Sequence, residues 1–231
     1  MMLIRTLYVW LIGLPVTIFL FILVIISLIF DRSGKAIHSI GRLWSRSLLF
    51  LSGVTVEVKG LENILAGKPQ IFASNHQGAF DILALQAFIP IQFRWVAKRS
   101  LFKIPIIGWS MSLAGYVSMD RERAGSAYKS IETAAEKVRN GICVLIFPEG
   151  TRSATGELLP FKRGGFLLAI KSGAPVVPLS IQGSTDIMRR GSLLIRPGLI
   201  KIAIGRPIHI AGADEKALMA AVRQAIEDGL S

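Results

Sequence analysis

The chain has 231 residues, long enough for one α/β domain with a sizeable core and too short for two large ones. Its single cysteine, Cys143, excludes an internal disulfide framework and indicates a reducing compartment. Lysine and arginine outnumber aspartate and glutamate by 27 to 15, which gives a formal charge of +12. This excess indicates an anionic partner: nucleic acid, a negatively charged membrane or a phosphorylated substrate.

The N-terminal region contains the strongest membrane signal. Residues 6–30 hold no charged side chain and consist largely of Leu, Ile, Val and Phe. As a helix they would reach about 37 Å, enough to cross a hydrocarbon core of ~30 Å. A cleaved signal peptide is the alternative, but this stretch is unusually long and lacks a small-residue cleavage site before Asp31. More basic residues follow the stretch than precede it, so the positive-inside rule predicts that the bulk of the chain lies in the cytoplasm.

Residues 33–52 have the spacing of an amphipathic helix. One narrow face carries the basic residues Lys35, His38, Arg42 and Arg46, and the opposite face carries Ile37, Ile40, Trp44, Leu48 and Leu51. Such a helix is predicted to lie in the lipid headgroup layer. One alternative is a helix packed on the protein's own core, and another is a hairpin of both N-terminal helices dipped into a single leaflet. Residues 1–52 are accordingly interpreted as membrane-anchoring helices, and residues 53–231 as an α/β domain.

Beyond residue 53, short β-like runs alternate with helical ones. The runs with strand character are 54–58, 69–74, 93–97, 142–147, 175–181, 193–196 and 201–204, and those with helical spacing are 80–88, 127–138, 165–171 and 214–228. The run 142–147 is apolar throughout, which is typical of a strand buried on both faces of a sheet. This alternation predicts a layered α/β fold, in which helices flank a mostly parallel or mixed sheet.

The sequence NHQGAFD (75–81) falls where an apolar strand is expected to end and a helix to begin. His76 and Asp81 are five positions apart, so they can meet only if His76 occupies the turn before the helix and Asp81 its first turn. A carboxylate bonded to one imidazole nitrogen makes the other a base that can take a proton from a hydroxyl group as it attacks an acyl carbonyl. The alternative is a helix-capping asparagine with an incidental histidine.

The sequence FPEGTRS (147–153) directly follows the buried apolar run. The carboxyl ends of strands are where α/β proteins place their sites. Gly150 allows close backbone approach, Thr151 supplies a hydroxyl group, and Arg152 presents a fork suited to phosphate. Glu149 is expected to bind substrate hydroxyl groups or to hold Arg152 in position. A surface turn with a local Glu–Arg pair is the alternative.

Two further cations, Lys98 and Arg121, are expected to converge with Arg152 on an anionic group. Arg121 ends the sequence GYVSMDR, and Lys98 lies in a stretch where basic and apolar residues are interleaved. The neighbouring Arg99 and Lys103 are interpreted as solvated surface charges.

Together and in this order, these sequences resemble the glycerolipid acyltransferase family, especially bacterial 1-acyl-glycerol-3-phosphate acyltransferases. The resemblance runs from about residue 54 to residue 210 and rests on NHQGAFD, GYVSMDR, FPEGTRS and VVPLS (176–180). GYVSMDR departs from the family pattern at Ser118, where phenylalanine is usual. The resemblance makes His76 and Asp81 the catalytic pair. It also implies that the glycerol phosphate is held by Arg121, Glu149, Gly150 and Arg152, and that Pro178 contributes to acyl-substrate binding.

The resemblance implies an enzyme of the bacterial inner membrane, with its catalytic domain on the cytoplasmic side. It would transfer a fatty acyl group from acyl-CoA or acyl-carrier protein to the sn-2 hydroxyl of 1-acyl-glycerol-3-phosphate, giving phosphatidic acid in phospholipid biosynthesis. No metal and no tightly bound cofactor is expected. The expected partners are the lysophospholipid, the acyl thioester, anionic membrane lipids and, where it is the donor, acyl-carrier protein.

Two other functions stay open at the level of sequence. The same blocks serve several acceptors, so another lysolipid or an amino-lipid is the alternative substrate. A non-catalytic protein that binds anionic lipid through its positive charge and its helices is the alternative of another class. Nucleic acid is not an expected partner, because the charges are scattered among apolar blocks and no nucleic-acid-reading motif is present.

Overall fold

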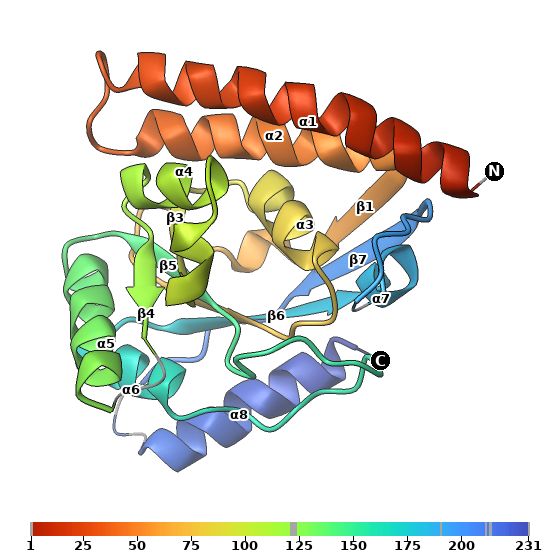
Figure 1. Cartoon of the computed structure of the whole chain (residues 1–231). Coiled ribbons are helices and arrows are strands. Elements are labelled where there is room, and N and C mark those ends of the chain that lie inside the picture. The colour runs from red at the N-terminus through yellow and green to blue at the C-terminus, as the bar shows by residue number, and fades with distance from the viewer. Residues whose placement is uncertain (1, 121–123, 190, 211, 213, 231) are drawn as a thin grey trace.

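A seven-stranded sheet forms the centre of the described part of the chain, in a computed structural model that covers residues 2–120, 124–189, 191–210, 212 and 214–230. Its strands, in chain order, are β1 (Val54–Lys59), β2 (Ile71–Ser74), β3 (Phe93–Lys98), β4 (Val117–Met119), β5 (Cys143–Ile146), β6 (Val176–Gln182) and β7 (Gly198–Ile204). Figure 1 shows helices above and below this sheet, as the alternating sequence pattern predicts.

The strands lie in the order β1–β7–β6–β2–β5–β3–β4. Neighbouring strands are parallel except β6 and β7, which are antiparallel. The central strands β2 and β5 pair with Phe72 beside Leu145 and are buried along their whole length, which explains their uninterrupted apolar sequences. The predicted mixed, mostly parallel sheet is confirmed. Because β2, β3 and β5 run parallel, the segments that follow them meet at one edge of the sheet.

Helices cover both faces of the sheet (Figure 1). One side carries α1 (Met2–Ser27), α2 (Lys35–Ser52), α3 (Phe80–Phe88) and α4 (Ile107–Leu113), and the other carries α5 (Ala124–Arg139), α6 (Gly164–Ser172) and α8 (Glu215–Asp228). Short helical turns complete the described elements: η1 (Leu61–Asn63), η2 (Arg99–Lys103) and α7 (Ser184–Ile187). Successive side chains of β2 point to opposite faces of the sheet. Phe72 packs in the core under α3, and Ile71 packs in the core under α6.

The helices α1 and α2 form an antiparallel hairpin on the α3 side of the sheet (Figure 1). The indole Nε1 of Trp44 donates to Thr17 Oγ1 at 2.9 Å across the hairpin. Val9 and Leu49 are buried in the same hydrophobic core as Phe72, so the hairpin packs on the domain. By length and composition α1 is able to cross a membrane. Many of its large apolar side chains are exposed, among them Leu7, Leu11, Ile18, Phe19, Ile22 and Ile25.

The orientation of α2 contradicts the predicted headgroup contact for His38 and Arg42, two of the four residues of its basic face, whereas Lys35 and Arg46 are exposed. His38 is completely buried, with Nδ1 3.1 Å from the hydroxyl oxygen of Tyr116, and burial lowers its pKa to about 3. Arg42 donates to the carbonyl oxygens of Ile89 and Ile91, at 2.7 and 3.1 Å, just beyond the C-terminal end of α3. Carbonyl groups at a helix end attract such a cation. The alternative interpretation, a helix packed on the protein's own core, is therefore the arrangement found.

The strand predicted over residues 193–196 is wrong, because this segment is irregular. Its backbone groups bond to helices instead of to a neighbouring strand. Ile195 N donates to Thr6 Oγ1 of α1 at 3.0 Å, and Arg196 N donates to the carbonyl of Ile187 in α7 at 2.9 Å. The segment thereby joins the N-terminal part of α1 to the edge of the domain.

Candidate active site

The loop after β2 starts from a fixed point at the carboxyl edge of the sheet. Asn75 is buried there, and its side chain forms two hydrogen bonds with the backbone of Ile181 in β6. Asn75 Nδ2 donates to the carbonyl oxygen at 2.9 Å, and Ile181 N donates to Asn75 Oδ1 at 2.8 Å. This pair of bonds ties the end of β2 to the neighbouring strand, so the turn that carries His76 is held in place.

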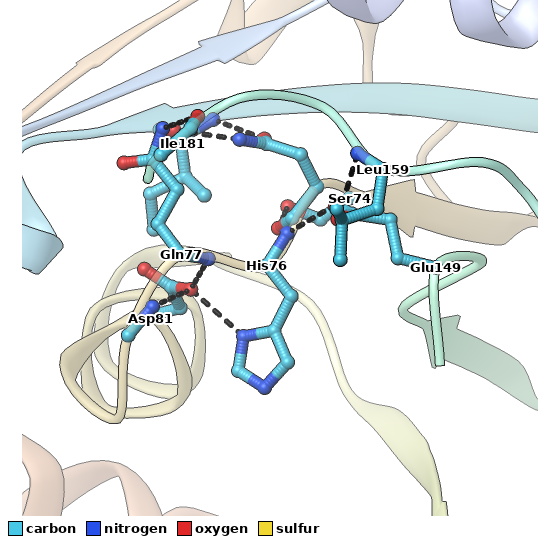
Figure 2. A network of polar contacts seen from close by, with 10 residues as sticks. Ser74, His76, Gln77, Asp81, Glu149, Leu159 and Ile181 are labelled. Atoms are coloured by element: carbon cyan, nitrogen blue, oxygen red, sulfur yellow. Dashed lines mark hydrogen bonds and ion pairs between the residues drawn. The ribbon is translucent and has the colours of Figure 1, made fainter. Parts of the chain in front are cut away.

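His76 and Asp81 face each other across that turn. His76 lies before α3 and Asp81 lies in its first turn, with His76 Nδ1 2.8 Å from Asp81 Oδ2 (Figure 2). This is the placement that the five-residue spacing requires, and it is confirmed. Figure 2 also shows the other ring nitrogen pointing away from the carboxylate.

Asp81 is anchored by more than the histidine. Its side chain is fully buried, and Oδ2 also accepts the backbone N–H groups of Gln77 at 2.6 Å and Gly78 at 2.8 Å. The N-terminus of α3 further favours a negative charge at this position. A carboxylate held in this way makes Nδ1 of His76 the hydrogen-bond donor and leaves the lone pair on Nε2. The pair is therefore built to present Nε2 as a base.

Glu149 fixes the backbone of the histidine from the opposite side. Its side chain is 2% exposed, Oε1 accepts His76 N at 2.7 Å, and Oε2 accepts Leu159 N at 3.2 Å. Ser153 N donates in turn to the carbonyl oxygen of His76 at 2.8 Å. Both backbone groups of His76 thus bond to the loop after β5. Burial raises the pKa of Glu149 to about 7, against the two backbone hydrogen bonds, which lower it.

An aromatic stack supports the imidazole ring. The ring of Phe147 lies parallel to that of His76, with centroids 3.9 Å apart and an interplanar angle of 9°. Trp95 stacks on Phe147 at 5.5 Å, and its Nε1 donates to Gln86 Oε1 of α3 at 2.7 Å. Neither ring is predicted as a site residue from the sequence. The available signal was an aromatic residue within β3 and another directly after β5, next to Pro148.

A cavity of about 700 Å³ lies beside His76, between the hairpin and the carboxyl edge of the sheet. Its walls come from α1, α2, α3, α4 and the ends of β3 and β5, and they are mainly apolar. Leu20, Ile40, Leu83, Ile106 and Met111 represent these elements and the turn before α4. Such a cavity accommodates an apolar chain and places it next to the base.

Four of the predicted binding residues line the same cavity as His76: Lys98, Gly150, Thr151 and Arg152. Lys98 ends β3 and the other three follow β5, so the parallel strands bring them together. Gly150 has a φ of 74°, a left-handed conformation that side-chain-bearing residues adopt only with strain. The glycine of FPEGTRS is therefore required by the shape of the loop.

Three other predicted binding residues do not line this cavity as described. Glu149 binds the backbone of His76 and Leu159 instead, so its predicted contact with substrate hydroxyl groups stays a prediction. Arg121 lies outside the residues that the structure describes. Pro178 is buried within β6 and does not line the cavity. It packs closely against Gly205, where an added Cβ atom would lie 2.8 Å from Cγ of Pro178. The predicted role of Pro178 with the acyl substrate and that of Arg121 with phosphate stay predictions.

Among the described residues, no group of three or more His, Cys, Asp or Glu side chains is arranged to hold a metal ion. The expectation that the chemistry uses neither a metal nor a tightly bound cofactor stays a prediction. Cys143 is free and buried in β5.

The fold and the site define a mixed α/β protein in which a histidine bonded to a carboxylate lines a largely apolar, cation-bearing cavity. The comparison with protein families agrees with that class, because residues 55–182 match the family described as Acyltransferase. The chain belongs to this acyltransferase family.

Individual relatives narrow the comparison. A chloroplastic 1-acyl-sn-glycerol-3-phosphate acyltransferase of Brassica napus is 37% identical over 190 residues, covering 81% of this chain and 55% of its own length. A 1-acyl-sn-glycerol-3-phosphate acyltransferase of Pseudomonas aeruginosa is 33% identical over 180 residues, covering 76% of this chain and 69% of its own length. The chain thus spans little more than half of the plant relative.

A solved structure extends the likeness to the hairpin. The crystal structure of the 1-acyl-sn-glycerophosphate acyltransferase PlsC from Thermotoga maritima matches with a TM-score of 0.87 and 28% identity. The match covers 99% of this chain and 94% of that one, so it includes both N-terminal helices.

Proposed function

We propose that this chain transfers a fatty acyl group from an acyl thioester to the sn-2 hydroxyl of 1-acyl-glycerol-3-phosphate, giving phosphatidic acid. The observation that carries the proposal is that the His76–Asp81 pair borders an apolar cavity that Lys98 and Arg152 also line. Each of these features matches one part of a lysophosphatidic acid. The histidine matches its hydroxyl group, the two cations match its phosphate, and the apolar cavity matches its hydrocarbon chain. The relatives that bear the name of this activity support the same substrate.

In the proposed reaction Nε2 of His76 takes the proton of the sn-2 hydroxyl. The oxygen attacks the thioester carbonyl carbon, the carbon–sulfur bond breaks as the tetrahedral intermediate collapses, and the departing thiolate takes the proton back from His76. Asp81 stabilises the imidazolium that forms in between and keeps the ring in one tautomer. The thioester is already activated, so positioning of the two substrates supplies much of the rate enhancement.

The phosphate of the acceptor is placed against Lys98 and Arg152. An arginine fork binds two phosphate oxygens, and the lysine adds a compact charge. Thr151 offers a hydroxyl group in the same loop. By its resemblance to the family block, Arg121 joins these groups. The apolar walls contributed by α1, α2 and α3 hold the acyl chain.

The hairpin is proposed to lie in one leaflet of the membrane. If α1 crossed the bilayer, α2 would follow it, because the two helices pack side by side (Figure 1). Yet α2 is bonded to the end of α3 through Arg42, so the domain would be drawn into the hydrocarbon as well. A single-leaflet position buries the exposed apolar side chains of α1 and leaves the domain in water. As the resemblance implies, that leaflet is the cytoplasmic one of a bacterial inner membrane.

A paired assay tests the proposal. The purified chain is incubated with acyl-CoA or acyl-carrier-protein donors and with a panel of lysolipid and amino-lipid acceptors, and the products are identified by mass. The expected product is phosphatidic acid acylated at sn-2. Turnover of another acceptor with inert lysophosphatidic acid would refute the proposed substrate. The same assay distinguishes the two donors, and acyl-carrier protein is a partner if it is the better one.

A further inference from the structure

The segment 99–113 has two apolar faces. It comprises η2, a turn and α4, and it lies beside the hairpin on the α3 side of the sheet (Figure 1). Its inner face lines the cavity with Leu101, Ile106, Ile107, Ser110 and Met111. Its outer face exposes other large apolar side chains, with Ile104 44% and Trp109 52% exposed. A protein in water rarely collects such side chains in one short segment unless that surface is covered.

The turn in this segment has a demanding backbone shape. Ile106 has a φ of 64° and a ψ of −63°, and Ile107 N donates to the carbonyl oxygen of Pro105 at 2.7 Å. This is the strained form of the γ-turn, and a β-branched residue is unfavourable in it. A Cβ added at Gly108 would collide with the backbone of Phe102. The turn therefore points Ile106 into the cavity while Ile104 and Trp109 stay outside.

The outer face of the segment is continuous with α1. The ring of Trp109 lies 5.9 Å from that of Phe21, centroid to centroid. Phe21 lines the cavity, and its neighbours Ile18 and Ile22 on α1 are exposed. The Phe21–Trp109 contact is therefore the place where α1 and the 99–113 segment, which both line the cavity, meet.

Cations flank the outer face. Arg99 and Lys103 are exposed, and Arg99 bonds to Asp120 at 3.0 Å. Arginine and lysine beside exposed apolar and tryptophan side chains are the combination that binds the headgroup layer of anionic membranes. The positive charge of the chain, +12, favours the same partner.

We propose that the 99–113 segment is a second lipid-contacting element. Ile104 and Trp109 insert at the headgroup–acyl boundary of an anionic bilayer, and Arg99 and Lys103 bind its headgroups. The segment and α1 then enter the same leaflet on either side of their contact, so lipid substrates pass from the leaflet into the cavity without crossing water. The inference rests on the proposed position of the hairpin in the membrane.

Site-specific labels test the position of the segment. The single cysteine is buried, so a Cys143→Ala background allows a fluorescent label to be placed at Ile104→Cys. Leu11→Cys, on the exposed face of α1, is the membrane control, and Lys129→Cys, exposed on α5, is the solvent control. The full chain is reconstituted into vesicles of phosphatidylcholine and phosphatidylglycerol that contain brominated lipids. We expect the lipids to quench the labels at 104 and 11, but not the label at 129.

Each other outcome of the labelling overturns the inference in a distinguishable way. Quenching at 11 but not at 104, with the 104 label open to aqueous iodide, would leave the hairpin in the membrane and the segment in water. A 104 label shielded from both lipid and iodide would indicate a second copy of the chain on this face. Absence of quenching at position 11 would remove the proposed hairpin position together with the inference.

Activity supplies a second test. The double variant Ile104→Asp and Trp109→Asp places charges on the outer face, and neither of the two replaced residues lines the cavity. With lysolipid presented in vesicles we expect a fall in kcat/KM of about tenfold or more, because two large side chains lose their apolar surroundings. With the same lysolipid in detergent micelles the rate should stay within about twofold of the wild type. Ile170→Asp, on α6, is the matched control. Equal losses in vesicles and micelles, or none in either, would contradict the inference.

Discussion

Replacing Glu149 with alanine tests whether this carboxylate acts through His76 or on the substrate itself. The wild-type side chain accepts His76 N at 2.7 Å and Leu159 N at 3.2 Å, so alanine leaves two backbone N–H groups without their acceptors. Each buried N–H that loses its partner costs about 1–3 kcal/mol. The unpaired N–H of His76 shifts the backbone and displaces the imidazole from the substrate hydroxyl group. If the same ~1–3 kcal/mol is added to the activation free energy, kcat falls by about 5- to 150-fold.

The assay separates positioning from binding. Initial rates of the purified variants are measured against lysophosphatidic acid concentration, with the donor saturating and the product identified by mass. Glu149→Gln retains one acceptor oxygen, so its kcat should lie between those of the wild type and Glu149→Ala, while KM stays within about twofold. Glu157→Ala removes an exposed carboxylate from the same loop and should leave both constants unchanged. A tenfold higher KM with an unchanged kcat would refute the reasoning and place Glu149 on the substrate.

Three other predictions follow from the same site. The pKa of Glu149 is raised from 4.5 to about 7, so its contribution to stability is present below pH 4.5 and is lost as the pH rises through 7. Thermal unfolding is measured between pH 4 and pH 8. Over that range the free energy of unfolding of the wild type should fall by roughly 3 kcal/mol more than that of Glu149→Gln. Parallel plots of unfolding free energy against pH for the two proteins would contradict this. Phe147→Leu should lower kcat about three- to tenfold, because it removes the ring beside His76. The control Phe161→Leu breaks a distant ring pair and should leave kcat unchanged. Equal effects of the two substitutions would argue against a role of the stack. Arg152→Ala should raise KM for the lysolipid about 10- to 100-fold and Lys162→Ala should not, whereas loss of donor saturation would place Arg152 at the thioester.

The sequence predicts the contact between His76 and Asp81 because the two residues lie close together in the chain. His76 and Asp81 are separated by a single turn at the start of one helix, and a strand-to-helix junction with their spacing can form one favourable arrangement. The contacts that hold this pair are not local. Glu149 lies 73 positions from His76, and nothing in FPEGTRS indicates that its carboxylate meets a backbone N–H rather than a substrate or Arg152.

The fold shows the same division between local and long-range information. The alternation of strands and helices predicts the layered sheet, but it leaves open the strand order and the antiparallel β6–β7 pair. The helix over 33–52 is amphipathic in sequence, and that pattern does not say which face meets lipid. Arg42 faces the domain because the end of α3 offers carbonyl groups that no sequence pattern shows. Residues 193–196 have the sequence pattern of a strand, yet their backbone partners are supplied by α1 and α7.

The most direct measurement of the central claim is the rate of phosphatidic acid formation by His76→Ala in vesicles, alongside its co-sedimentation with those vesicles. Removal of the base should lower kcat by about 10²–10⁴-fold, while the fraction bound to lipid stays that of the wild type. Acylation that persists near the wild-type rate in this variant would contradict the account, because another group would then be removing the proton.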